Sequence, residues 1–486
     1  MGVNRGGFLN MKRLKNVLFN GGYYLVNALF PLLTYPYVTR VLGVEGVGEA
    51  NIAIAVSAYF CMLASLGIPV YGIREIGRCK GDKGSLDRLV SELILINILG
   101  VLVSLGVYVV ALFHVELMLG AKYLFLITGI NVALGFLQLD WFFQGTEMFK
   151  FIAMRNLIVK LFSIVSIYLF LENGSQVDIY LWITVFAGVG ANFLNLFYMY
   201  KNVSFRVKGI DLRRHVRAVL FFSVNRIASS FYTILDGVVL AVVTNNYYVG
   251  LYTTSIKLVR IIGALISSVT IVFFAEISKL VSSEDEGYAG ALAEILAILL
   301  IFSFPAVGFC MVFSEELIQL FAGEDFLESA GLLEVLASLI LVSVLTGFIG
   351  MQILYANNME WVVLVSLMTG ATVCLVSNLC LVEEFKAFGA AVSVLLAEVA
   401  ILCVQLYFVV SKSLVDVCNL LYRVRPILFS FFLFLVISVL MSFALMGLPS
   451  FLIVIISFAV LSVVYVVSLM FFREKIVLDV IGGLRL

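Results

Sequence analysis

Four charged residues interrupt two consecutive hydrophobic segments in the middle of the chain. The first segment carries Arg226 and Asp236, and the second, which follows a turn at Asn245, carries Lys257 and Arg260. Each segment is long enough to cross a bilayer, which takes about 20 residues. A charge in the hydrocarbon core is costly, about 3 kcal/mol on insertion scales, so such side chains usually face a protein interior or water. The four residues therefore predict a polar site within the membrane.

The spacing of these residues indicates which of them can pair. Polar residues recur at steps of three and four in both segments, which puts them on one face of each helix. In an antiparallel pair, the helical rise places Asp236 about 12 Å and Lys257 about 15 Å below the turn, so these two can meet. Arg226 and Arg260 then have no acid on their own hairpin. Because a guanidinium stays charged and binds two phosphate or carboxylate oxygens at once, we expect both arginines to bind an anionic ligand.

Two further polar residues join this candidate site. Lys160 lies about 14 Å inside its own hydrophobic run by helical rise, and Asn27 belongs to a polar stripe on the first run. The predicted substrate-binding residues are Arg226, Arg260, Lys257, Lys160, Asp236 and Asn27. Structural alternatives stay open: Lys160 can snorkel to the membrane surface, the acid–base pair can serve stability alone, and Glu294 or Glu398 can neutralise an arginine. Asparagine stripes also often mediate packing between membrane helices.

The helices that must position these residues are evident from the composition. Of the 486 residues, 63% are hydrophobic and 13% are charged, whereas soluble domains carry about 25% charged residues. We therefore predict an all-α polytopic membrane protein. The net charge of zero favours no nucleic-acid partner. Seven cysteines without a CxxC pair, and only two histidines, predict neither a metal site nor a disulfide framework.

Fourteen hydrophobic runs follow one another along the chain. They cover residues 17–41, 47–70, 89–113, 117–144, 151–171, 178–200, 218–244, 247–275, 290–313, 331–355, 361–382, 387–411, 427–447 and 450–472. With the N-terminus inside, and with bases near the run ends counted with the adjoining segments, the inner segments hold 24 of the 31 Lys and Arg residues, the outer segments hold three, and the runs hold four. The positive-inside rule requires such a bias. We therefore expect both termini in the cytoplasm.

The runs group into two halves. We expect an N-terminal lobe at 1–205, a basic cytoplasmic linker at 206–217, a C-terminal lobe at 218–411, and two last spans with a cytoplasmic tail at 412–486. Faint repeats agree: residues 47–50 (VGEA) and 249–252 (VGLY) are 202 positions apart, and residues 144–149 and 356–361 are about 211 apart. Two six-helix halves related by an axis along the membrane normal produce such repeats, with a binding site between them. Chance matching of glycine and apolar residues is the alternative.

Residues 139–160 (LDWFFQGTEMFKFIAMRNLIVK) resemble the O-antigen and polysaccharide flippase family of the multidrug/oligosaccharidyl-lipid/polysaccharide exporter superfamily. Further similar stretches lie, in the family's order over roughly the first 400 residues, at 36–43 with 46–48, 66–75, 236–240 with 249–252, and 388–391. The resemblance implies a V-shaped pair of six-helix lobes around a central cationic cavity, followed by two C-terminal helices. Lys160 and Asp236 are the matched positions that fit such a cavity.

The resemblance also implies a function. The expected activity is the transport of an undecaprenyl-diphosphate-linked oligosaccharide, an O-antigen or other surface polysaccharide repeat unit, across the bacterial inner membrane for lipopolysaccharide or related biosynthesis. The expected partners are this lipid-linked oligosaccharide, membrane lipids, and assembly proteins such as a polymerase and a chain-length regulator. We expect no enzyme activity and no cofactor, and coupling to a proton or to sodium stays open.

Three other functions agree less well with the sequence. A cation-coupled multidrug exporter of the same superfamily needs an acidic, apolar cavity, whereas this chain has an excess of base within its spans. A membrane O-antigen polymerase needs a large outer loop with catalytic residues, but the longest outer segment, residues 314–330, is short and holds no base. The lipid II flippase branch carries an acid close after an arginine on its first helix. Here Glu45 follows Arg40, but in a predicted outer loop.

Overall fold

The computed structural model describes residues 11–79, 82–174, 176–205, 210–282, 287–472 and 474. Within these ranges, the side chains at 11–29, 224–234, 269, 271–272, 275–276, 282, 418–419 and 421 are outside the description. The described chain forms helices joined by short turns, without a strand, so the predicted all-α fold class is confirmed. It falls into two compact units, Met1–Ser230 and Phe231–Leu486, called unit 1 and unit 2 below.

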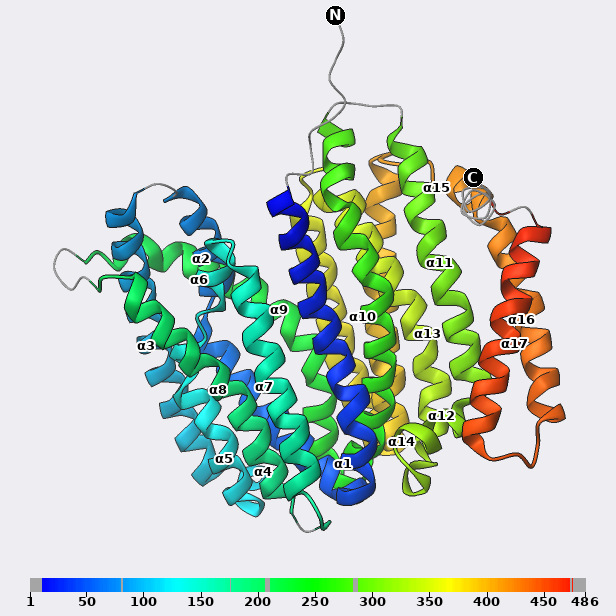
Figure 1. The fold of residues 1–486 in the computed structure, drawn as a ribbon, viewed down its shortest axis with the longest axis horizontal. Coiled ribbons are helices and arrows are strands. Elements are labelled where there is room, and N and C mark those ends of the chain that lie inside the picture. The colour runs from blue at the N-terminus through cyan, green and yellow to red at the C-terminus, as the bar shows by residue number, and fades with distance from the viewer. Residues whose placement is uncertain are drawn as a thin grey trace, which may run out of the picture. The chain divides into compact units, whose positions relative to one another are not determined.

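Unit 1 combines long helices with short connecting ones (Figure 1). They are α1 (Met11–Ser65), α2 (Ile68–Arg78), α3 (Lys83–His114), α4 (Glu116–Gly120), α5 (Lys122–Ala133), η1 (Gly135–Leu137), α6 (Asp140–Gly145), α7 (Phe149–Phe170) and α8 (Val177–Asn202). Helix α9 (Arg213–Val243) begins in unit 1 and ends in unit 2.

Unit 2 is also built of long helices and short connecting ones. Its helices are α10 (Asn246–Ser282), α11 (Tyr288–Val312), α12 (Ser314–Phe321), η2 (Glu324–Phe326), α13 (Ser329–Phe348), η3 (Ile349–Tyr355), α14 (Glu360–Ser411), α15 (Val417–Arg423), α16 (Arg425–Ala444) and α17 (Ser450–Phe471). Helix α13 packs against α10, α11 and α14, and α16 packs against α11 and α17. The bounds predicted for the two lobes and the linker stay a prediction.

Eleven helical segments in the described ranges are long and apolar enough to cross a membrane. Two of them, Phe30–Arg78 and Glu360–Ser411, contain 49 and 52 residues, more than twice the roughly 20 residues that one crossing takes. In the first segment, α1 is divided at the non-helical residue Gly43 (φ 67°) and a turn then separates it from α2. In the second, α14 is divided at the non-helical residue Lys386 (φ 51°). The chain is therefore a multi-pass helical membrane protein, as predicted. The count of fourteen spans stays a prediction.

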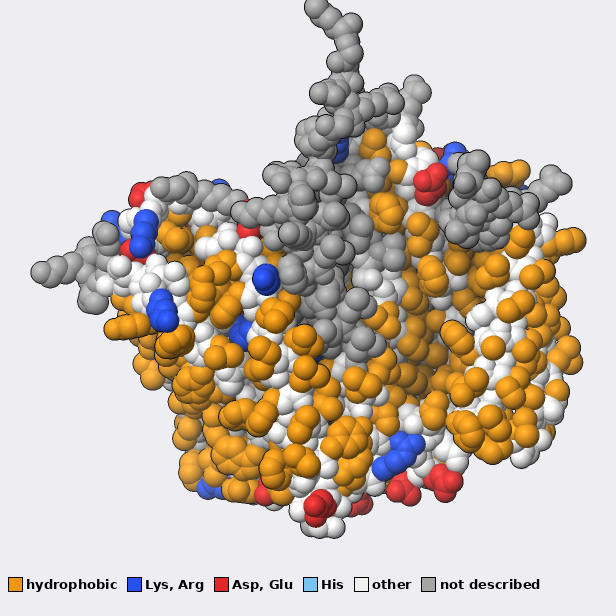
Figure 2. Space-filling view, in the orientation of Figure 1, with side chains coloured by type: hydrophobic (Ala, Val, Ile, Leu, Met, Phe, Trp, Pro, Cys, Tyr) orange, Lys and Arg blue, Asp and Glu red, His pale blue; other side chains and the backbone are white. Residues whose placement is uncertain are grey.

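Close helix contacts in unit 1 depend on small residues. Helix α1 packs against α3, α5, α7 and α8, while α2 packs against α6. At the α2–α6 contact, a Cβ added to Gly72 would lie 2.5 Å from Cε3 of the buried Trp141, so only glycine fits there. Outward-facing side chains are largely apolar, and charged ones lie mainly near the helix ends on the face drawn in Figure 2. This distribution suits a surface in contact with lipid.

One backbone turn occurs in both units. Glu147 (φ 61°) follows α6 and Asn358 (φ 56°) follows η3, and the two residues are 211 positions apart. A left-handed residue at this place closes a helix, as in Schellman-type C-terminal caps. The matching backbone hydrogen bonds are Glu147 N–Gln144 O (3.0 Å) with Asn358 N–Tyr355 O (3.1 Å), and Met148 N–Phe143 O (2.8 Å) with Met359 N–Leu354 O (2.9 Å). The sequence repeat near residues 144 and 356 therefore corresponds to a repeated backbone structure.

Candidate functional site

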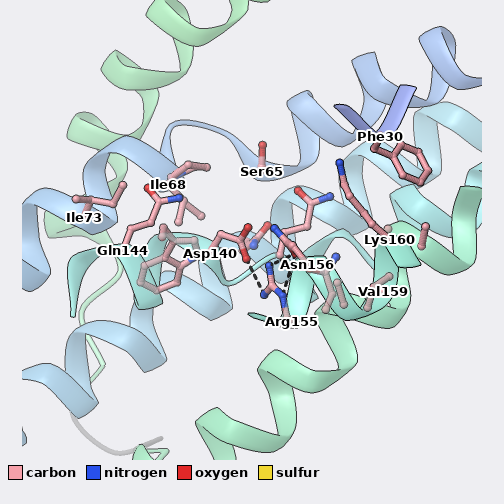
Figure 3. A pocket seen from close by; sticks show the side chains of 18 residues that line it. Phe30, Ser65, Ile68, Ile73, Asp140, Gln144, Arg155, Asn156, Val159 and Lys160 are labelled. Atoms are coloured by element: carbon pink, nitrogen blue, oxygen red, sulfur yellow. Dashed lines mark hydrogen bonds and ion pairs between the residues drawn. The ribbon is translucent and has the colours of Figure 1, made fainter. Parts of the chain in front are cut away.

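Unit 1 contains a cavity of about 430 Å³ among α1, α2, α3, α6, α7 and α8 (Figure 3). Half of the 18 residues that line it are polar: Ser65, Asn97, Gln138, Asp140, Gln144, Arg155, Asn156, Lys160 and Asn192. The apolar half is Phe30, Ile68, Pro69, Ile73, Trp141, Val159, Ala187, Gly188 and Ala191. A volume in this range is typical of small-molecule sites, which occupy about 300–1,000 Å³. Six helices thus build a polar chamber inside an otherwise apolar unit.

An ion pair forms one wall of this cavity. The Arg155 side chain is 3% exposed, and its Nη1 lies 2.9 Å from Asp140 Oδ1. Arg155 also donates to the side-chain oxygens of Asn195 and, from Nη2 at 2.9 Å, of Asn156. Asn195 Nδ2 donates to Asp140 Oδ1 at 3.4 Å. Because a buried guanidinium requires an acid and several acceptors, this network neutralises Arg155 and fixes it in place.

Lys160 gives the cavity its net charge. Its Nζ lies 4.7 Å from the centre of the Phe30 ring, and the side chain is half-buried. In the part of the chain that the structure describes, no carboxylate lies within 4.0 Å of this ammonium group. With Arg155 neutralised by Asp140, the lining residues carry one positive charge. The cavity is therefore suited to a single anionic group.

Several polar groups of the cavity lack partners. Asn97 Oδ1 and Trp141 Nε1 are buried and have no hydrogen-bond partner among the described residues. The side-chain amides of Gln138 and Gln144 also form no hydrogen bond within the described ranges. Burying an unmet polar group costs about 1–3 kcal/mol, and native structures usually satisfy such groups with protein, water or a ligand. These groups offer both donors and acceptors to a hydroxylated ligand.

A second cavity, of about 340 Å³, has a different character. Residues of α16 and α17 line it, and Ser468 is the single polar residue among the seven. A wall of this kind offers contacts to hydrocarbon but neither charge nor amide groups. The cavity of unit 1 is therefore the better candidate for a polar cargo.

Three predicted charged residues of α9 and α10, Asp236, Lys257 and Arg260, lie in unit 2, but they pair differently from the prediction. Asp236 is 2% exposed and accepts a hydrogen bond from Tyr252 Oη. Arg260 Nη2 lies 3.8 Å from Asp236 Oδ2, and the Arg260 side chain is 45% exposed. The expectation that Arg260 lacks an acid on its own hairpin is therefore wrong. The basic partner of Asp236 is Arg260, because its long side chain spans the difference in depth, and Lys257 is half-buried on the same helix.

The predicted site residues lie in different parts of the structure. Lys160 lines the unit 1 cavity, whereas Asp236, Lys257 and Arg260 belong to unit 2. Arg226 in α9 and Asn27 in α1 have side chains outside the described set, so their predicted roles stay predictions. Glu398 is 7% exposed, and Thr346 donates to it at 3.3 Å. The structure therefore brings one of the predicted residues to the cavity and brings Asp236 together with Arg260.

A buried carboxylate in unit 1 organises a further polar cluster outside the cavity lining. Glu92 is fully buried and accepts hydrogen bonds from the backbone N–H of Asp211 (2.9 Å) and from Arg88 Nε (3.1 Å). His215 Nε2 lies 2.9 Å from Glu92 Oε2, and Arg214 forms a second ion pair with the same oxygen. This cluster fixes the start of α9 to α3.

Sequence reasoning missed both buried networks. Asp140 lies seven residues before Glu147 and Arg155 eight residues after it, so their near-equal spacing about this turn was a usable signal. The contact of Glu92 with Arg214 joins residues 122 positions apart. The signal for it was indirect: an acid in the first turns of an apolar run and a basic linker, RRH at 213–215, that needs a counter-charge.

Comparison with known proteins places this geometry in context. A sequence model of the family described as "Polysaccharide biosynthesis protein" matches residues 13–281. A Shigella dysenteriae protein proposed to be an O-antigen transporter is 23% identical over 279 residues, which are 56% of this chain and 68% of that protein. An Escherichia coli (strain K12) protein proposed to have the same activity is 24% identical over 169 residues, 34% of this chain and 40% of the relative.

Solved structures share the fold. The lipid II flippase MurJ in an inward closed conformation superposes with a TM-score of 0.74 and 14% identity, covering 96% of this chain and all of MurJ. An inward-facing multidrug resistance MATE family transporter of the MOP superfamily has a TM-score of 0.60 and 13% identity, over 82% of this chain and 98% of the transporter. At these identities the likeness concerns the fold alone.

Proposed function

Because the chain belongs to the polysaccharide biosynthesis protein family, we propose that it is a flippase for a lipid-linked oligosaccharide. The observation that carries the proposal is the family match over residues 13–281, which contains the polar cavity of unit 1 and the charged hairpin of unit 2. The cargo is an undecaprenyl-diphosphate-linked repeat unit of an O-antigen or another surface polysaccharide. It moves from the inner to the outer leaflet of a bacterial plasma membrane, and both termini of the chain are cytoplasmic.

The diphosphate presents the main energetic obstacle to such transport. An anion that leaves water must exchange its hydration for fixed donors, because charge in hydrocarbon is strongly disfavoured. Within the predicted spans 218–244 and 247–275, helices α9 and α10 carry three bases, Arg226, Lys257 and Arg260, against one acid, Asp236. The excess of positive charge supplies charge-assisted hydrogen bonds to phosphate oxygens. We assign the diphosphate to these bases.

Arg260 is suited to this role by its loose pairing. The 3.8 Å between its Nη2 and Asp236 Oδ2 exceeds the usual hydrogen-bond length of about 2.7–3.2 Å. The guanidinium therefore keeps donors available for an incoming phosphate, and its side chain is 45% exposed. Asp236, which accepts a hydrogen bond from Tyr252, lowers the free-energy cost of the Arg260 charge when no cargo is bound.

Movement of the cargo requires access from each side in turn. Two repeated helical units provide a basis for alternating access, in which one unit moves against the other around a bound substrate. The chain would act without covalent chemistry, so it is a transporter and not an enzyme. A proton or sodium ion is a suitable coupling ion, and a polymerase and a chain-length regulator would receive the product.

Drug export by the same fold is the second candidate, but the positive charge of the unit 1 cavity does not favour it. A lipophilic cation requires acidic or apolar contacts, whereas the unit 1 cavity carries one net positive charge and many amides. Efflux of cationic dyes separates the two functions. We expect cells that overproduce the chain to retain such dyes as strongly as cells with an empty vector.

Deletion and complementation test the proposal in the native host. A strain without the chain should accumulate the lipid-linked oligosaccharide at the inner leaflet and lose the surface glycan, and re-expression should reverse both. Arg260→Ala should not complement and Arg260→Lys should complement in part, because lysine supplies charge without the bidentate fork. Lys412→Ala, at an exposed site beyond α14, is the matched control and should complement fully. Surface glycan at normal levels in the deletion strain would contradict the proposal.

A further inference from the structure

The two copies of the repeated turn differ in their polar residues. At the offset of 211, the cavity residues Asp140, Arg155, Asn156 and Lys160 of unit 1 correspond to Met351, Ser366, Leu367 and Ala371 of unit 2. The backbone hydrogen bonds of the turn are the same in both copies. Turn and flanking helices therefore form without the charges. The polar cavity is a property of unit 1 that the shared scaffold does not require.

The hydrogen-bonding groups of the cavity match a hydroxylated ligand. An amide side chain presents donors and an acceptor side by side, and a sugar hydroxyl is both donor and acceptor. Asn97, Gln138 and Gln144 provide such groups, and Asn97 Oδ1 is buried without a partner in the described chain. At about 30 Å³ per water, the 430 Å³ volume has room for roughly 14 waters. A sugar ring with a few bridging waters fits this space.

The charge is concentrated at one end of the cavity. In Figure 3, Lys160 and Phe30 lie at one end of the labelled residues, and Gln144 and Ile73 lie at the other. The Asp140–Arg155 pair between them is neutral. A ligand that fills the cavity thus meets one cation at one end and uncharged amides along its length.

We propose that the unit 1 cavity binds a sugar ring that carries one anionic group, with the hydroxyls on Asn97, Gln138 and Gln144 and the anion on Lys160. The anion is either a ring carboxylate or a phosphate on the ring, since an ammonium group binds both. This inference rests on the proposed function in that the sugar belongs to the transported glycan. It assigns glycan recognition to unit 1 and leaves the diphosphate of the lipid carrier to α9 and α10.

Direct binding to the purified full-length protein tests the inference without transport. The chain has three tryptophans, and Trp141 lines the cavity while Trp182 and Trp361 are exposed. A Trp182→Phe/Trp361→Phe protein therefore has one tryptophan, at the site. Its fluorescence is titrated with glucuronate, galacturonate, glucose 1-phosphate, glucose and inorganic phosphate, each up to 50 mM at constant ionic strength.

We expect a saturable fluorescence change with at least one anionic sugar, and at least tenfold weaker binding of glucose and of inorganic phosphate. A response to the uronates identifies the carboxylate as the anion, and a response to glucose 1-phosphate identifies the phosphate. Lys160→Met should remove the preference for the anionic sugar. Lys150→Met, at an exposed position outside the cavity, is the matched control and should keep it.

Two results would overturn the inference. One is no saturable change with any of the three anionic sugars in a protein that remains monodisperse. The other is an unchanged preference for the anionic sugar after Lys160→Met. The proposed function can fail independently of this inference. If the protein binds the sugar but does not restore surface glycan in the complementation assay, the flippase function is refuted and the sugar site stands. If it restores surface glycan but does not bind the sugar, the sugar site is refuted and the flippase function stands.

Discussion

Replacing Glu92 with alanine removes the carboxylate that joins α3 to the start of α9. Glu92 is fully buried, and the His215 side chain beside it is 5% exposed. In the tautomer with hydrogen on Nε2, His215 donates to Glu92 and accepts from Tyr71 Oη at Nδ1, 2.7 Å away. The substitution leaves the buried His215 ring and the part-buried Asp211 N–H without their acceptor.

The size of the effect follows from these contacts. The stranded buried donor of His215 costs about 1–3 kcal/mol. The part-buried Asp211 bond and the pairs to Arg88 and Arg214, whose side chains are 43% exposed, contribute less than about 1 kcal/mol each. The total is about 3 kcal/mol, at the lower end of the roughly 3–5 kcal/mol for breaking a buried pair from one side. Unit 1 spans 230 residues, and a domain of this size loses about 2–4 °C of thermal stability per kcal/mol. The midpoint temperature of thermal unfolding should therefore fall by about 6–12 °C.

Heating followed by size-exclusion chromatography in detergent measures this midpoint. Glu75→Ala is the matched control, because Glu75 pairs with Arg74 and Arg78, whose side chains are 46% and 65% exposed. Such surface pairs are worth about 0.5 kcal/mol each, so the loss of both should lower the control's midpoint by only about 2–4 °C. A Glu92→Ala midpoint as high as that of Glu75→Ala would refute the reasoning.

Two further predictions concern packing and topology. Gly72→Ala should destabilise the protein by about 1–3 kcal/mol through overpacking against Trp141, whereas Gly77→Ala, which meets nothing within 4 Å, should be neutral or slightly stabilising in the same thermal assay. A periplasm-active reporter should be silent when fused at Gly209 and active when fused at Glu324, and activity at Gly209 would contradict the predicted orientation.

The helices could be predicted from the sequence because their signal is local. A membrane helix needs a long apolar run, and this requirement can be read from the composition of each segment. The breaks inside the two longest helices were also predictable as run boundaries, near Gly43 and Lys386. The repeated turn was visible as a faint match, and the backbone at Glu147 and Asn358 gives it a physical basis.

The partners of the buried charges could not be predicted in the same way. Helical rise gives the depth of a residue but neither the rotation of its helix nor the reach of its side chain. Asp236 and Lys257 lie at similar depths, yet Arg260, three residues deeper, reaches Asp236. The cavity of unit 1 depends on six helices meeting, so its polar residues appeared in the sequence as separate stripes.

Transport in proteoliposomes tests the central claim most directly. Vesicles are prepared with the host's own undecaprenyl-diphosphate-linked oligosaccharide in both leaflets, and a membrane-impermeant reagent oxidises the glycans exposed outside. The oligosaccharide of the inner leaflet, about half of the total, is at first protected from this reagent. In vesicles with the wild-type protein, we predict that this inner fraction becomes accessible over time. In vesicles with the Arg260→Ala protein, and in vesicles without protein, it should stay protected. An inner fraction that stays protected in the presence of correctly inserted wild-type protein, with and without an imposed proton or sodium gradient, would contradict the account.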